Sequence, residues 1–276
     1  LYISHRLPEV RRLADRLTVL RDGRVVAAGV SGDVDEPTLI DWMAGAEARS
    51  SEAAARHAST AVASVPTSGR RDGRPALRVD GLTRGTALRG VTFEVAAGEV
   101  LGLSGLVGAG RTETLRAIVG ADRVDAGRLL RDGVALHPRQ PSDAARAGIG
   151  LVPEDRKGEG LLLAASVREN ATLGSVGARF ARGGWIDEAS ERHHVRDVLQ
   201  RLEVAYASLD QPVETLSGGN QQKVVLARWL LRECAVLLAD EPTRGIDVTA
   251  RRTVHAVLRG LAEAGRAVVV ASSDLD

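Results

Sequence analysis

The stretch that decides the fold is residues 216–247, LSGGNQQKVVLARWLLRECAVLLADEPTRGID. It opens with a serine and two glycines, continues with helical spacing over 221–232, and ends in an apolar run, 235–240, that terminates in Asp240 and Glu241. An apolar run without polar alternation is typical of a strand that a sheet buries on both faces. The run 267–272, AVVVAS, has the same character. We therefore predict an α/β fold with a parallel sheet at its core.

Outward from this stretch, predicted strands alternate with predicted helices. The predicted strands are 76–79, 91–95, 100–105, 149–152, 235–240 and 267–272. The predicted helices are 112–119, 187–202, 221–232 and 248–263. Residues 47–74 are small, polar and charged with Pro66 and Gly69 as breakers, a composition typical of an interdomain linker.

Composition excludes several classes of protein. The chain has 276 residues, 44% of them hydrophobic, which is enough for a sizeable core. Its net charge of +1 is not the strongly positive charge that is typical of a nucleic-acid-binding protein. Cys234 is the single cysteine, which excludes an internal disulfide and fits a reducing compartment. Apolar runs of about five residues fall far short of the roughly 18 that a membrane span needs. Of the 37 basic residues only Lys157 and Lys223 are lysines, leaving 37 − 2 = 35 arginines.

A glycine-rich loop, residues 105–112, GLVGAGRT, follows the predicted strand 100–105. It matches the phosphate-binding pattern G-x-x-x-x-G-K-[ST] except that Arg111 stands where lysine is expected. Such a loop curls backbone amides around phosphate oxygens, and the hydroxyl of Thr112 suits Mg²⁺. Guanidinium is planar and wider than ammonium, so we expect nucleotide binding to survive better than catalytic geometry.

The predicted strand 235–240 delivers two carboxylates beside this loop. Asp240 is suited to hold Mg²⁺ through water, and Glu241 to polarise an attacking water as a general base. A second anion site is expected at the start of the predicted helix 221–232. Backbone amides and a hydroxyl form it, from Ser217, Gly218 and Gly219. A second such site is useful where two domains face each other and each closes over the partner's nucleotide.

The order of these motifs resembles the ATPases of ABC transporters. More narrowly, GLVGAGRTE (105–113), PEDRKGEGL (153–161), LSGGNQQK (216–223) and DEPTRGID (240–247) resemble the second ATPase half of bacterial sugar importers of the ribose, galactose and xylose type. In that family one polypeptide carries two tandem ATPase domains. The resemblance covers about residues 75–276, and residues 1–45 fit the end of the first half.

The resemblance implies a P-loop NTPase core with a parallel sheet, an antiparallel β subdomain and a helical signature subdomain. It divides the chain into the tail of a first ATPase domain (1–46), a linker (47–74) and a second ATPase domain truncated at its C-terminus (75–276). The chain is thus expected to be a fragment. The similarity of LYISHRLPE at the start to VVVASSDLD at the end, which aligns His5 with Ser273, supports a repeat.

The family's roles carry over residue by residue. The catalytic positions are Glu241 and, as the switch histidine of the first half, His5, while Mg²⁺ falls to Thr112 and Asp240. The positions that contact ATP are Gly105, Gly108, Ala109, Gly110, Arg111, Thr112, Glu154, Asp240, Ser217, Gly218, Gly219, Asp247 and Ser273. Here Glu154 is the Q-loop position, Asp247 the D-loop aspartate and Ser273 the switch position.

Four departures weaken the nucleotide face of this domain. Arg111 replaces lysine, Glu154 replaces glutamine, Ser273 replaces histidine, and no aromatic residue stands at 82–84 to stack on adenine. We therefore expect the domain's own site to bind ATP with slow or no turnover. Its signature is expected to serve the site of the first half, which also uses His5.

The implied partners are membrane permease subunits and an extracytoplasmic solute-binding protein, with the chain peripheral to the cytoplasmic face of the membrane. No nucleic-acid partner is expected. Two alternatives stay open: a soluble ABC ATPase outside transport, and a regulatory module that binds ATP without turnover. The sequence does not identify the sugar. In the family, the stretch with Arg156 and Lys157 touches the membrane subunit; the alternative is a solvated loop. Trp185, Trp229 and Cys234 are expected to pack in the core.

Overall fold

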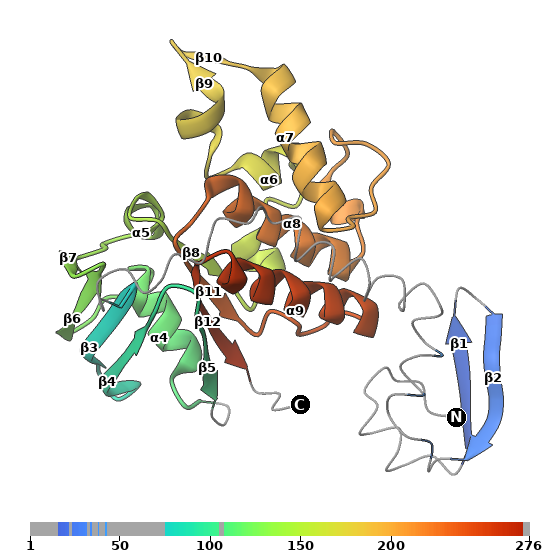
Figure 1. Cartoon of the computed structure of the whole chain (residues 1–276), viewed down its shortest axis with the longest axis horizontal. Coiled ribbons are helices and arrows are strands. Elements are labelled where there is room, and N and C mark those ends of the chain that lie inside the picture. The colour runs from blue at the N-terminus through green and yellow to red at the C-terminus, as the bar shows by residue number, and fades with distance from the viewer. Residues whose placement is uncertain are drawn as a thin grey trace.

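The computed structural model describes residues 16–21, 24–31, 34, 38, 42, 75–104 and 108–272 (Figure 1). The predicted linker, His5, Gly105 and Ser273 lie outside these residues. Near the N-terminus, β1 (Arg16–Arg21) and β2 (Arg24–Ser31) pair as an antiparallel hairpin that the sequence reading did not predict.

The parallel sheet predicted from the apolar runs is present. Its strands are β5 (Val100–Ser104), β8 (Ile149–Val152), β11 (Val236–Asp240) and β12 (Ala267–Ser272), in the order β5-β12-β11-β8. All neighbours run parallel, with Leu238 opposite Leu151 on one side and Val269 on the other. The order places β11 and its terminal Asp240 inside the sheet, where only apolar side chains can precede the carboxylate.

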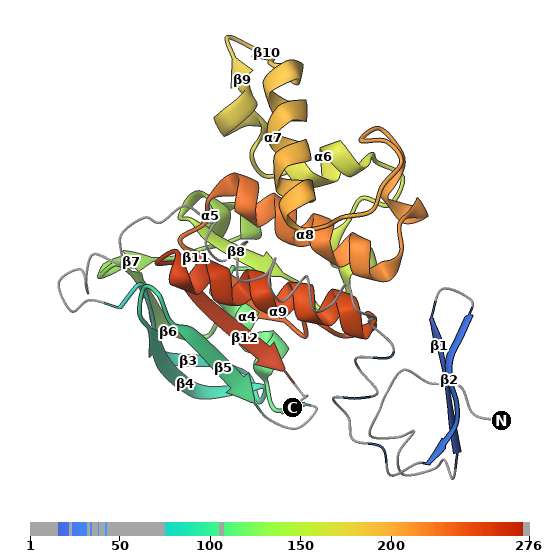
Figure 2. The ribbon, with the colours of Figure 1, turned by 45° about the vertical axis from the view of Figure 1, so that its right-hand side comes forward.

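Both faces of this sheet are covered, which explains why its strands lack polar alternation. Leu237 and Val268 belong to a core shared with α8 (Gly218–Arg232) and α9 (Val248–Glu263). Val236 and Leu238 point to a second core, shared with α4 (Arg111–Ile118). Figure 2 shows α9 and α8 on one side of the sheet and α4 on the other.

A second, antiparallel sheet packs against α4. It is formed by β3 (Leu77–Arg84), β4 (Leu88–Val95), β6 (Ala126–Arg131) and β7 (Val134–Leu136), in the order β4-β3-β6-β7. Leu77 and Val79 of β3 share the second core with Leu115 and Ile118 of α4. The short helix α5 (Pro141–Arg146) leads into β8.

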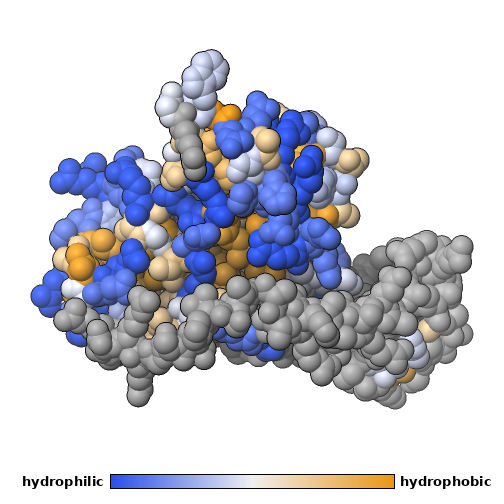
Figure 3. Space-filling view, turned by 45° about the horizontal axis from the view of Figure 1, so that its top comes forward, coloured by the Kyte–Doolittle hydropathy of each residue, from blue (hydrophilic) through white to orange (hydrophobic). Residues whose placement is uncertain are grey.

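A helical subdomain packs along α8 and completes the expected architecture. It contains α6 (Val167–Thr172) and α7 (Glu188–Arg201), both in contact with α8. The shorter pieces are the π-helices η1 (Arg156–Gly160) and η2 (Val176–Phe180), the 3-10 turn η3 (Val213–Thr215), and the two-residue strands β9 (Ala181–Arg182) and β10 (Trp185–Ile186). Figure 3 shows mostly hydrophilic side chains on the face turned to the viewer, with hydrophobic ones in small areas.

No helix in the described part of the chain is long and apolar enough to cross a membrane.

The predicted elements hold with small changes of boundary. The helix expected over 221–232 begins already at Gly218, and strands 76–79 and 91–95 extend to Leu77–Arg84 and Leu88–Val95. Cys234 is buried as expected, and Trp229 packs against the first core. The prediction that Trp185 packs in the core was wrong, because Trp185 is 83% exposed in the β9–β10 hairpin.

Candidate functional site

The described end of the glycine-rich loop turns directly into α4. Gly108 and Gly110 have φ of 83° and 89°, a region that favours glycine. At Gly110 there is also no room for a side chain, because a Cβ would lie 2.7 Å from the carbonyl oxygen of Ala87. The Gly110 carbonyl accepts the first helical hydrogen bond, from the Thr114 amide at 2.9 Å. Arg111 and Thr112 therefore stand at the helix N-terminus, as the motif requires.

Asp240 and Thr112 meet at the carboxyl end of β11. Asp240 is 3% exposed and lines the same cavity as Thr112. Burial raises the pKa of Asp240; the nearby Thr112 hydroxyl opposes this rise, and the neighbouring Glu241 carboxylate adds to it. Its Oδ1 atom is buried without a hydrogen-bond partner. A hydroxyl and a carboxylate with an unsatisfied oxygen are the hard oxygen donors that suit Mg²⁺, so these residues fit that ion.

Arg111 lies against Glu241 across the same corner. Its Nη1 is 3.1 Å from Glu241 Oε1, and the two side chains are only 13% and 10% exposed. The same nitrogen has no aligned hydrogen bond, so charge and not hydrogen-bond geometry holds the pair. Glu241 itself has φ of 43° and its amide donates to the Ala271 carbonyl at 2.8 Å, which fixes its backbone between β11 and β12. The cation of the loop thus engages the predicted general base.

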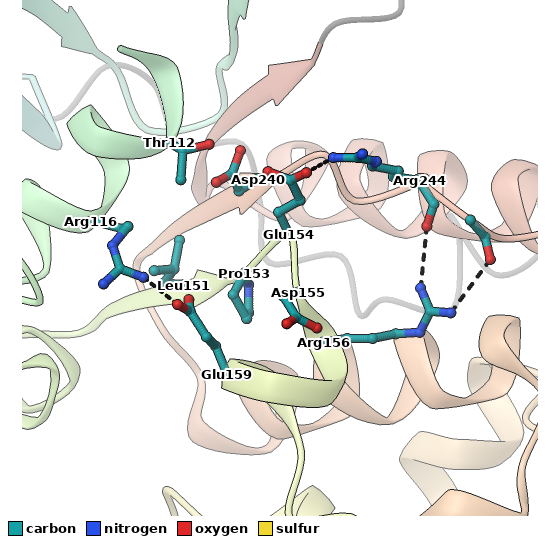
Figure 4. Close-up of a pocket in the computed structure, with 11 residues that line it drawn as sticks. Thr112, Arg116, Leu151, Pro153, Glu154, Asp155, Arg156, Glu159, Asp240 and Arg244 are labelled. Atoms are coloured by element: carbon teal, nitrogen blue, oxygen red, sulfur yellow. Dashed lines mark hydrogen bonds and ion pairs between the residues drawn. The ribbon is translucent and has the colours of Figure 1, made fainter. Parts of the chain in front are cut away.

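A cavity of about 520 Å³ opens beside this corner (Figure 4). Glu154 reaches it from the end of β8 and forms an ion pair with Arg244 from the loop after β11. Across the cavity, Arg116 of α4 pairs with Glu159 of η1. The remaining lining residues are Thr112, Leu151, Pro153, Asp155, Arg156, Asp240 and Gly245.

The signature residues form a second cluster at the start of α8. Ser217 is the N-cap, and its side chain accepts a long hydrogen bond from the Asn220 amide at 3.4 Å. Asp247 caps α9 in the same way, with Oδ1 accepting from the Ala250 amide at 2.9 Å. A Cβ on Gly219 would lie 2.7 Å from that of Ala250 and 3.3 Å from Asp247 Oδ2. The starts of α8 and α9 are therefore in contact, with Asp247 beside the signature glycines.

The structure thus sorts the predicted site residues into two groups. Arg111, Thr112, Asp240 and Glu241 meet in one corner, with Glu154 on the wall of the adjoining cavity. Ser217, Gly218, Gly219 and Asp247 meet in the other.

Sequence reasoning missed the residues that line the space between the two groups. Arg244 lies within the motif DEPTRGID but was given no role, and Arg116 and Glu159 were not considered. Arg156 was considered only as an outward-facing residue. Charge alone does not show which of 35 arginines contacts which carboxylate or carbonyl, so the sequence carries no signal for these contacts.

Comparison with known proteins identifies the family. The ABC transporter family model matches residues 88–244, more than half of the chain. The solved structure of cbiO1 from Clostridium perfringens, part of the ABC transporter complex cbiONQ, matches with a TM-score of 0.59 and 26% identity over 74% of this chain and 80% of that chain. The protein belongs to the ABC transporter family and has the fold of its ATPase cassettes.

Relatives narrow the resemblance to proteins of sugar import. The ribose import ATP-binding protein RbsA of Chelativorans sp. (strain BNC1) is 45% identical over 99% of this chain and 51% of its own length. The ribose import ATP-binding protein RbsA 1 of Streptomyces avermitilis is 47% identical over 99% of this chain and 50% of its own length. These similarities confirm the expected resemblance to sugar importers. The chain spans about half the length of the curated relatives it matches.

Proposed function

We propose that the chain is part of the ATP-binding subunit of an importer for a monosaccharide or similar small polar solute. In this proposal its own nucleotide site binds ATP but turns it over slowly or not at all, and its signature serves the site of the first ATPase half. The subunit acts at the cytoplasmic face of the membrane, on permease subunits that an extracytoplasmic binding protein supplies with solute. Support for the sugar class comes from relatives named for ribose import.

The observation that supports slow turnover is the pair between Arg111 and Glu241, 3.1 Å apart and nearly buried. A general base must hold its carboxylate toward an attacking water. Here a guanidinium occupies one carboxylate oxygen, so a water must compete with a fixed positive charge. The same contact places one Nη of the loop's cation against Glu241, which leaves only its other nitrogens to reach phosphate oxygens.

The other residues of the corner remain suited to hold nucleotide. Thr112 and Asp240 would hold Mg²⁺, which when bound neutralises charge on the phosphate oxygens. The N-terminus of α4 offers backbone amides to phosphate, and Gly108 and Gly110 have the positive φ that lets a backbone curl around such a group. Binding and turnover thus depend on different residues, which is why we expect the first to survive without the second.

The experiment compares ATP hydrolysis by the full-length protein carrying Glu241→Gln with that of Ser217→Arg. If the signature serves the competent site of the first half, Ser217→Arg removes turnover because a long cation blocks the start of α8. Glu241→Gln then has a small effect, since Glu241 is already engaged by Arg111. Ser142→Arg, on the exposed start of α5, is the matched control for adding an arginine.

Equal losses in the two variants, or a greater loss in Glu241→Gln, would contradict the proposal. Calorimetric titration of ATP into the two variants separates binding from turnover. We expect Glu241→Gln to bind at both sites.

A further inference from the structure

The side chain of Arg156 turns inward and holds the loop that joins β11 to α9. Arg156 begins η1, two residues beyond Glu154. Its Nη1 donates to the carbonyl of Arg244 at 3.2 Å, and its Nη2 lies 3.5 Å from the carbonyl of Gly245 (Figure 4). These bonds join parts of the chain 88 and 89 residues apart. One guanidinium fork therefore fixes two consecutive peptide groups of a loop without regular secondary structure.

A side chain of the same loop also contacts the segment that contains Arg156. The guanidinium of Arg244 pairs with Glu154, while its own carbonyl accepts from Arg156. Two kinds of interaction therefore hold the segment 154–156 to the loop 244–245: an ion pair between side chains, and hydrogen bonds from a guanidinium to backbone carbonyls. We call this double contact the clasp. Arg156 also lines the cavity that contains Thr112 and Asp240, so the clasp forms part of the wall beside the domain's own nucleotide corner.

The third element of the contact is the first glycine of α8. A Cβ on Gly218 would lie 2.5 Å from Nη2 of Arg156 and 3.4 Å from the carbonyl oxygen of Gly245. The backbone of Gly218 is helical, so its conformation does not require glycine. The glycine instead leaves room for the guanidinium of Arg156, which would have to move if a Cβ were added at this position. Arg156 is therefore packed between the signature and the loop that leads to Asp247.

We propose that Arg156 is a positioning residue that holds the signature glycines and Asp247 in one fixed arrangement. Asp247 follows Gly245 by two residues and lies beside Gly219. Arg156 contacts the loop through the Gly245 carbonyl and the signature through Gly218, so it holds the two partners of this contact in place. This inference rests on the proposed function in one respect: the fixed arrangement is the surface offered to the nucleotide of the first half. Lys157 next to it is exposed and takes no part.

The first test is hydrogen exchange, read by mass spectrometry on the nucleotide-free full-length protein. The amide of Arg244 donates to Glu241 and that of Ala250 to Asp247, so peptides covering 241–251 report the loop. Arg156→Ala is expected to make them exchange about tenfold faster, because it removes charge-assisted hydrogen bonds. Arg156→Lys replaces the planar guanidinium by a single ammonium, so its exchange rate should lie between those of the wild type and Arg156→Ala.

The matched control is Arg201→Ala, which removes an exposed pair with Asp197 on α7. It should leave exchange in 241–251 unchanged. Gly218→Ala places a methyl where the guanidinium lies, so it should speed exchange in 241–251 as Arg156→Ala does. The double variant should exchange no faster than Arg156→Ala alone. Wild-type exchange in Arg156→Ala would overturn the clasp, whether or not the proposed function holds.

The second test is ATP hydrolysis by the assembled transporter. Because Arg156 positions other residues, Arg156→Ala should lower kcat and leave KM for ATP within about twofold. Faster exchange with an unchanged kcat would overturn the positioning role. Faster exchange together with full activity in Ser217→Arg would instead leave the clasp standing and reject the proposed use of the signature.

Discussion

At the residue scale, Arg111 shows how one side chain changes the chemistry of a site. In a chain with 35 arginines and two lysines, an arginine in place of lysine is expected by composition alone. Its position makes it matter, because this nearly buried guanidinium at the start of α4 has the Glu241 carboxylate as its partner. A lysine on its flexible stem presents a single point charge and lacks the wide, planar group that lies against Glu241.

A second residue-scale contact gives a stability prediction. Gly150 in β8 packs against the ring of Trp229, whose Nε1 donates to the Leu151 carbonyl at 2.9 Å. A Cβ on Gly150 would lie 2.6 Å from the ring. Gly150→Ala should therefore lower the free energy of unfolding by about 1–3 kcal/mol through overpacking, measured by chemical denaturation.

The control for this change is Gly102→Ala in β5. Both glycines lie on edge strands of the same parallel sheet, and a Cβ on Gly102 meets nothing within 4 Å. It should be neutral or stabilising, since alanine reduces the freedom of the unfolded chain. Equal effects of the two substitutions would reject the role of the Trp229 ring.

At the element scale, α6 depends on a capping box, which a helix this short needs because each end leaves backbone groups without partners. The Ser166 side chain accepts from the Glu169 amide at 3.1 Å, and Glu169 Oε2 accepts from the Ser166 amide at 2.8 Å. The helix carries Asn170, whose side chain bonds the carbonyls of Leu162 and Ser166 and so ties the preceding loop to it. The cap thus stabilises the entry to the whole helical subdomain.

Ser166→Ala should cost about 1 kcal/mol of unfolding free energy at neutral pH. The hydrogen bonds from Ser166 lower the pKa of Glu169 below its usual value. A lowered folded-state pKa means stability that is present above the unfolded pKa of about 4.3 and lost as the pH falls through the folded pKa. The cost of Ser166→Ala, measured by denaturation across pH, should therefore shrink below that range.

Glu169→Gln is the control for the charge. Glutamine also completes a capping box, so helix formation persists while the titrating group is gone. In that background the cost of Ser166→Ala should no longer depend on pH around 4. A cost that stays constant with pH in the wild-type background would contradict this account.

At the scale of the whole molecule, the parallel sheet separates two cores, and the helical subdomain adds a buried ion pair to one of them. Glu191 of α7 is 1% exposed. It accepts from Arg168 Nη1 at 2.5 Å and from the Thr172 hydroxyl at 2.7 Å, both on α6. Arg168 also lies 3.5 Å from Asp210 in the loop before η3. One carboxylate thereby joins two helices and balances a charge held inside the subdomain.

Glu191→Ala should lower the free energy of unfolding by about 3 kcal/mol, because it leaves the Arg168 charge, which is 18% exposed, with Asp210 alone as its partner. Asp197→Ala, which breaks an exposed pair on the same helix, should cost less than about 1 kcal/mol. Denaturation curves of the two variants measure the difference. Similar costs would show that the buried pair adds nothing beyond a surface pair.

Much of the fold was predictable because its signals are local. The apolar strands Ile149–Val152 and Ala267–Ser272 and the helix Val248–Glu263 were predicted to the residue, since periodicity and burial coincide there. The short elements β6, β7, α5 and α6 were missed, because a few residues carry too little periodicity. Trp185 was misplaced because a large apolar residue is normally buried, and only the hairpin shows that it is not.

The sequence by itself determined the motifs, their order and the residue types of the nucleotide corner, since these follow from spacing along the chain. Only the tertiary structure decided which charges meet: Arg111 with Glu241, Glu154 with Arg244, and Arg156 with the carbonyls before Asp247. The physical reason is that an ion pair depends on distance in space. Parallel strands bring together residues more than 80 positions apart, and that separation leaves no pattern in the sequence.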